Sequence, residues 1–120
     1  MGRSHLFAGE ILLANGRAEE AARSFDAALR RDPRSGEALL GLAKATVAIQ
    51  GAFTPEALAM FQQAGEISND PAPWLYQAMA AMEQGQHAEA RRLWGEALSR
   101  MGPDDPRREM AIRFASGQQP

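Results

Sequence analysis

The 120-residue chain contains no cysteine, which excludes disulfides, thiolate metal sites and thiol nucleophiles. The absence leaves the compartment open, because a chain without cysteine suits the cytosol and the periplasm alike. Histidine is scarce as well: only His5 and His87 occur, and neither has a second His, Asp or Glu at the spacing of metal ligands. We therefore expect no metal site and no cofactor.

Lysine is almost missing too: Lys44 is the single lysine, whereas the chain has 12 arginines. The 13 basic and 15 acidic residues are interspersed and give a net charge of -2, so no basic stripe is available to neutralise phosphates. We expect no nucleic-acid partner. No apolar run approaches the roughly 20 residues that span a bilayer, and residues 1–5 lack the apolar region of a signal peptide. We expect no membrane insertion in this stretch.

Motifs of catalysis are also lacking. The chain has no Gly-rich phosphate loop, no nucleophile elbow and no HExxH string. Acidic pairs such as Glu19-Glu20 lie at expected helix starts, where the helix dipole explains them. With 45% apolar and 23% charged residues, the composition is that of a folded globular chain. We expect one folded domain that is not an enzyme.

What the chain does contain is an internal repeat. Three segments, which begin at Asn15, Gly51 and Gln84, each read Gly, a polar step, Glu-Ala, an aromatic residue, another Ala and a closing Pro. The matched residues are Ala21, Phe25, Ala28 and Pro33; Ala57, Phe61, Ala64 and Pro71; and Ala90, Trp94, Ala97 and Pro103. The first Ala recurs after 57−21 = 36 and 90−57 = 33 residues. Periods of this size indicate an array of helical hairpins.

Each repeated residue type has a packing role. The small residue lets two helices approach closely, the aromatic fills the space between hairpins, and Pro stops the second helix. Helices of matching pattern precede the repeats over residues 3–14, 36–50 and 72–84, with Gly9, Ala43 and Ala78 at their close-contact positions.

Two helix starts can be predicted from their capping residues. In the longer turn of the second repeat, Thr54 is expected to cap a helix that begins at Pro55. After Pro103, Asp105 is expected to cap a last helix that begins at Pro106 and covers the open apolar face of the last hairpin.

The repeat resembles the tetratricopeptide family, whose period is about 34 residues. The resemblance implies an all-α fold, a right-handed superhelical stack of three hairpins plus a C-terminal capping helix, with about seven helices in a single domain over residues 1–120. The expected repeats cover residues 2–35, 36–70 and 71–103, and the capping helix covers residues 105–116.

In such a stack the first helix of each hairpin lines the concave face. By helical phase, the predicted peptide-binding groove contains Leu6, Phe7, Glu10, Leu40, Lys44, Val47, Leu75, Tyr76, Met79 and Met82. An apolar trough with flexible methionines suits an amphipathic helix as the ligand. In some tetratricopeptide domains a clamp of Lys, Arg and Asn side chains holds the C-terminal carboxylate of a peptide. Such a clamp is disfavoured here, because Gly41 and Tyr76 occupy positions where it would need Asn. The alternative is that some of the apolar groove residues pack between hairpins and do not face a ligand.

The C-terminal half carries a closer resemblance. The strings TPEAL, WLYQAMAAMEQG, ARRLWGEAL and GPDDPRRE are similar to the C-terminal domain of the c-type cytochrome biogenesis family CcmI, also called CycH. The resemblance implies a periplasmic domain of a membrane-anchored protein. Such a domain would hold the C-terminal helix of apocytochrome c and present it to the haem-ligation machinery.

Two other functions stay open. The first is a general adaptor that assembles another protein complex, in the cytoplasm or the periplasm. The second is an oligomerisation module whose groove is filled by the terminus of a neighbouring chain, with residues 118–120 and the helix before them as the inserting segment.

Overall fold

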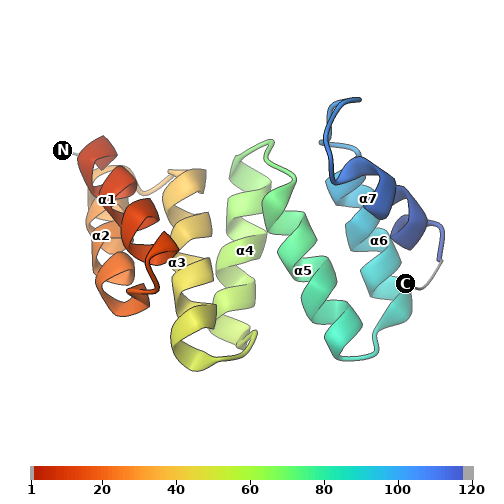
Figure 1. Ribbon diagram of the computed structural model, residues 1–120, viewed down its shortest axis with the longest axis horizontal. Helices are drawn as coiled ribbons and strands as arrows, with labels where there is room; N and C mark the ends of the chain where they lie inside the picture. The colour runs from red at the N-terminus through yellow and green to blue at the C-terminus, as the bar shows by residue number, and fades with distance from the viewer. Residues whose placement is uncertain (1, 118–120) are drawn as a thin grey trace. The chain divides into compact units, whose positions relative to one another are not determined.

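The computed structural model describes residues 2–117, and these form seven α-helices without a strand among them (Figure 1). The helices are α1 Gly2–Ala14, α2 Ala18–Arg31, α3 Gly36–Gln50, α4 Pro55–Ile67, α5 Ala72–Glu83, α6 His87–Leu98 and α7 Arg108–Ala115. They fall into two compact units: unit 1 holds α1 to α4 and ends at Ser68, and unit 2 begins at Asn69 and holds α5 to α7. The predicted all-α fold of three hairpins and a C-terminal helix is confirmed. Residues 118–120 of the expected inserting segment lie outside the described residues.

The turn inside each hairpin contains a glycine in the left-handed region. The φ angles are 76° at Gly16, 72° at Gly51 and 74° at Gly85. Glycine adopts this conformation without steric cost, and it commonly ends helices in this way. The glycine of the sequence repeat therefore reverses the chain between the two helices of each hairpin.

The start of α4 follows the prediction. The Thr54 hydroxyl accepts a hydrogen bond from the backbone N–H of Ala57 at 3.2 Å, and Pro55 is the first residue of the helix. The longer turn before it also contributes to packing, because the rings of Phe53 and Phe61 lie 6.2 Å apart. The extra residues thus place an aromatic side chain against a fully buried one.

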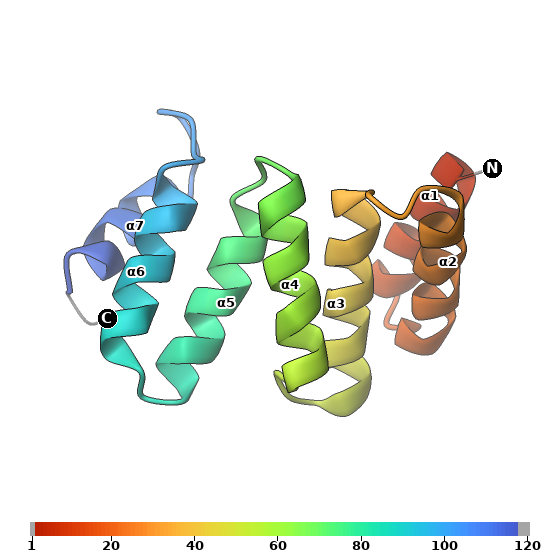
Figure 2. The ribbon, with the colours of Figure 1, turned by 180° about the vertical axis from the view of Figure 1, so that it is seen from behind.

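The core of unit 1 is centred on Phe25 of α2, which is 1% exposed. In this unit α2 packs against α1 and α3, and α3 packs against α4 (Figure 2). A Cβ atom added to Gly9 would lie 2.8 Å from the Phe25 ring, and one added to Gly41 would lie 2.3 Å from it. Both distances are far inside van der Waals contact. Glycine on α1 and on α3 therefore makes the space that the ring occupies.

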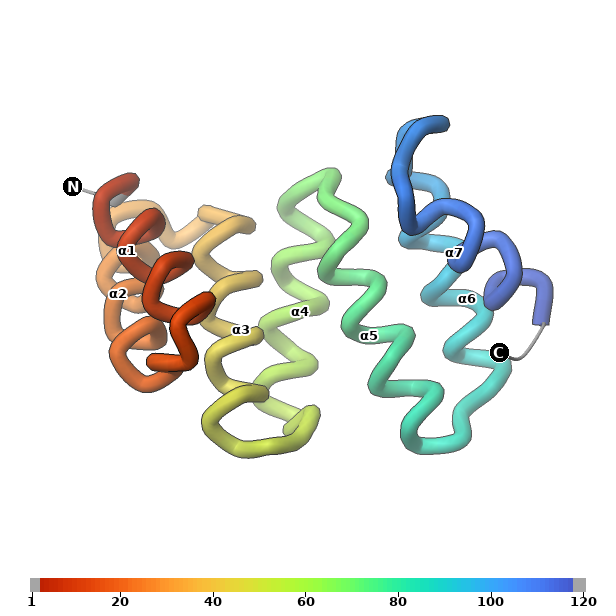
Figure 3. Tube along the Cα trace, viewed as in Figure 1, coloured from red at the N-terminus to blue at the C-terminus, as the bar shows by residue number. Residues whose placement is uncertain are grey.

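The core of unit 2 is centred on Trp94 of α6, which is 3% exposed. Its ring stacks on Phe114 of α7 with centroids 4.8 Å apart, and its indole N–H donates to the sulfur of Met82 on α5 at 3.1 Å. One side chain thus contacts all three helices of the unit, whose backbone Figure 3 traces from green to blue. The terminal helix packs against α6, where the sequence placed it.

The start of α7 differs from the prediction. The helix begins at Arg108, because a turn with Pro106 in its second position comes first and is closed by a 3.0 Å bond from the Arg108 N–H to the Asp105 carbonyl. The Asp105 carboxylate accepts from the backbone N–H of Arg107 at 2.9 Å and from its guanidinium at 2.8 and 3.0 Å. Asp105 therefore orders the turn before the helix and does not cap the helix itself.

The Asp105–Arg107 contact predicts a pH dependence of stability. The side-chain hydrogen bond from Arg107, and then its backbone bond, lower the pKa of Asp105 from 3.8 to about 2. Because the pKa is depressed in the folded chain, this stabilisation is present above the unfolded pKa of 3.8 and is lost as the pH falls toward 2. We expect the difference in urea midpoint between wild type and Asp105→Asn to shrink over this acidic range. A difference that is constant with pH would contradict the assignment.

Candidate functional site

In unit 1, the predicted groove residues of α1 and α3 lie on two helices that touch each other. Phe7 is 65% exposed and Glu10 is exposed beside it on α1. On α3, Leu40, Lys44 and Val47 are half-buried. Unit 1 therefore offers a surface that combines a large exposed ring, partly covered aliphatic side chains and one charge of each sign.

In unit 2, the predicted groove residues of α5 differ in their exposure. Met79 is 45% exposed, whereas Tyr76 and Met82 are half-buried. The Met82 sulfur is engaged by the indole N–H of Trp94, so this methionine is held in place by α6. Met79 is therefore the most accessible apolar contact that α5 provides.

Two predicted groove residues contribute to packing instead. Leu6 is 9% exposed and belongs to the core around Phe25, and Leu75 is 8% exposed and belongs to the core around Trp94. Helical phase placed them with exposed residues one or four positions away, because such positions border the same apolar stripe of a helix. The structure separates them from Phe7 and Met79 by burial.

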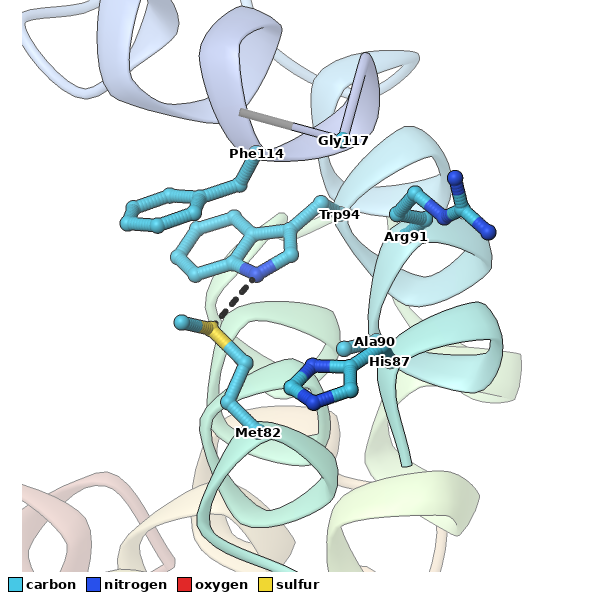
Figure 4. A pocket seen from close by; sticks show the side chains of 7 residues that line it. All are labelled: Met82, His87, Ala90, Arg91, Trp94, Phe114 and Gly117. Atoms are coloured by element: carbon cyan, nitrogen blue, oxygen red, sulfur yellow. Dashed lines mark hydrogen bonds between the residues drawn. The ribbon is translucent and has the colours of Figure 1, made fainter. Parts of the chain in front are cut away.

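Unit 2 also has a pocket that the sequence did not indicate. It has a volume of about 210 Å³ and lies where α5, α6 and α7 meet (Figure 4). The residues that line it are Met82, His87, Ala90, Arg91, Trp94, Phe114 and Gly117. In the sequence Trp94 indicates only packing, and His87 only lacks partners at the spacing of metal ligands. The pocket needs residues from three helices, so no spacing in one segment could have revealed it.

Within residues 2–117, no three His, Cys, Asp or Glu side chains gather closely enough to hold a metal ion. Over the same stretch, every helix is too short or too polar to cross a bilayer.

Several solved structures have the same fold as this chain. The chain is similar to the type III secretion translocator chaperone SycD of Yersinia enterocolitica, with 18% identity, a TM-score of 0.79 and coverage of 95% of this chain and 78% of that one. SycD in complex with a peptide of the translocator YopD matches with the same identity and TM-score, over 95% and 86% of the two chains. PcrH in complex with the chaperone binding region of PopD matches at 20% identity and a TM-score of 0.74, over 94% and 85%.

One of the two sequence comparisons shows the family. No curated protein sequence matches this chain. The model of the tetratricopeptide repeat matches it twice, over residues 8–71 and 42–106. These two ranges together cover residues 8–106, which include the three glycine turns described above. The chain belongs to the tetratricopeptide repeat family.

Proposed function

We propose that this chain binds a segment of a partner protein on the exposed face of the first helix of its hairpins, and that this binding is its whole activity. The observation that carries the proposal is the exposure of Phe7 on α1 and Met79 on α5, 65% and 45% respectively. Both occupy positions that helical phase predicts to face a ligand, and each offers one accessible apolar contact to it.

The solved relatives in fold support peptide binding. SycD is solved with a peptide of YopD, and PcrH with the chaperone binding region of PopD. A scaffold of this kind needs no catalytic groups, since side-chain contacts with the bound segment supply the affinity. A ligand segment that places apolar residues against Phe7 or Met79 fits the side chains available here.

For the ligand, we propose an amphipathic helix, with the C-terminal helix of apocytochrome c as the first candidate. The similarity of the C-terminal half to the CcmI family is the reason, and it brings with it a periplasmic location and the haem-ligation machinery as a further partner. A chaperone-binding segment of a secreted translocator is the second candidate, because SycD and PcrH share the fold.

Calorimetric titration of the full chain separates these candidates. The probes are a peptide of an apocytochrome c C-terminal helix, its scrambled version, and the YopD and PopD segments. Saturable binding of the native apocytochrome peptide alone supports the first candidate, and binding of a translocator segment alone supports the second. A chain that binds none of them overturns both.

Within that titration, Met79→Ala is expected to weaken binding of the active peptide by about 1 kcal/mol, or roughly fivefold in Kd, as for a central apolar contact. The matched control is Met110→Ala on α7, because Met110 is also 45% exposed but lies outside the predicted groove residues. Met110→Ala should leave the Kd unchanged. An equal loss of affinity in the two variants would contradict the assignment of the exposed face of α5 as a binding surface.

A further inference from the structure

The pocket of unit 2 combines a buried apolar floor with a basic rim. Trp94 and Ala90 are each 3% exposed, and half-buried Met82 and Phe114 complete the apolar side. His87 and Arg91 are exposed and lie to the other side of the pocket in Figure 4. None of the seven lining residues is acidic. The pocket therefore offers an apolar surface bordered by the positive charge of Arg91.

Arg91 differs from its neighbour Arg92 in what it contacts. Arg92 forms an ion pair with Glu89 at 2.6 Å, and its hydrogen bond holds the pKa of Glu89 below the usual range. Among residues 2–117, Arg91 has no hydrogen bond or ion pair, and its guanidinium lies near Gly117 at the end of α7. An unpaired guanidinium beside an apolar pocket can bind a carboxylate through two parallel hydrogen bonds.

The volume limits what the pocket can hold. Sites for drug-sized ligands and cofactors usually measure about 300 to 1,000 Å³, and this pocket measures about 210 Å³. That size suits one large side chain. Trp94 and Phe114 provide flat apolar contact, and the flexible thioether of Met82 can adapt to the shape of the guest.

We propose that this pocket anchors one large apolar side chain of a bound partner segment, and that Arg91 binds an Asp or Glu carboxylate next to it in that segment. The proposal rests on the proposed function, since it names one contact that a bound segment makes. It predicts a preference for a Leu-Glu type of sequence over segments that lack either the apolar or the acidic residue.

The test uses short peptides capped at both ends, so that only the side chains carry charge. The three probes contain Leu-Glu, Leu-Gln or Ala-Glu in an otherwise identical sequence, and the indole N–H resonance of Trp94 in the labelled full chain reports binding. We expect Leu-Glu to move this resonance saturably. Leu-Gln should bind about two- to fivefold more weakly, as for an exposed ion pair, and Ala-Glu about tenfold more weakly or worse.

Variants at the two neighbouring arginines provide matched controls, because they change the net charge equally. Arg91→Gln should bind Leu-Glu and Leu-Gln with equal affinity, whereas Arg92→Gln should keep the preference for Leu-Glu. Neither side chain is buried, so both variants are expected to fold. Equal affinity of the wild type for Leu-Glu and Leu-Gln, or a Trp94 resonance that does not move, would overturn the proposal.

The outcome is distinguishable from failure of the proposed function. A chain that binds a partner peptide in calorimetry while the Trp94 resonance stays unmoved keeps the function and loses the pocket. A chain that shows the Leu-Glu preference at Trp94 but binds none of the partner peptides keeps the pocket and loses the proposed partners.

Discussion

Replacing Phe25 by Ala is expected to lower the free energy of unfolding by about 3–5 kcal/mol, the range for removal of a buried aromatic side chain. Phe25 is 1% exposed, and its ring lies between the backbones of α1 and α3 at Gly9 and Gly41. Removing the ring leaves a space that two helix backbones must close. Urea unfolding followed by far-UV circular dichroism measures the loss. Both tryptophans lie in unit 2, so their fluorescence would report on the other unit.

A double-mutant cycle tests the reason for the loss. Gly41→Ala alone should destabilise unit 1 by about 1–3 kcal/mol through overpacking, although Ala normally favours a helix over Gly by about 1 kcal/mol. In the Phe25→Ala background the same change should be neutral or stabilising, because the new Cβ enters vacated space. Gly95→Ala on α6 is the control, since outside the adjoining backbone of its own helix no atom lies within 4 Å of its added Cβ. If the losses from Phe25→Ala and Gly41→Ala add up, the Cβ added at position 41 does not compete with the Phe25 ring for the same space.

Trp94→Ala is expected to cost unit 2 about 3–5 kcal/mol, because Trp94 is 3% exposed and contacts both Met82 of α5 and Phe114 of α7. The loss of stability should be larger in α7 than in α5. Without the Trp94 ring, Phe114 loses its stacking partner, so the amides of α7 should exchange faster than those of α5. Hydrogen exchange measures the local change, and urea unfolding measures the total.

The control for this prediction is Trp94→Phe, which keeps a ring against Phe114 and loses the N–H donor to Met82. We expect it to cost about 1–2 kcal/mol, mostly from the smaller buried ring and less from the weak bond to the thioether. An α7 that exchanges as fast in Trp94→Phe as in Trp94→Ala would mean that ring stacking does not hold this helix.

The fold could be predicted largely from repeated residues. Phe25 and Trp94 sit at equivalent repeat positions, and both are buried centres of their units. The cap at Thr54 was also predictable, because a cap depends on residues three apart in one segment. The start of α7 was not: the bonds that Asp105 makes depend on where the Arg107 side chain lies.

The candidate site could be predicted less well. Leu6 and Phe7 are neighbours in one helix, yet one is buried and the other is 65% exposed. Gly41 appeared only as a position where a carboxylate clamp would need Asn, whereas in the structure it makes room for the Phe25 ring. Both distinctions depend on which residues of other helices lie opposite.

The sequence by itself determined the repeat, the helices and the small and aromatic contact positions, because these follow from local propensity, capping and the spacing of residues along one chain segment. Only the tertiary structure decided which apolar residues stay exposed, why Gly41 has no side chain, and that Arg91 borders a pocket floored by Trp94. These features come from side chains on different helices that meet in space, and such meetings leave no periodic signal in the sequence.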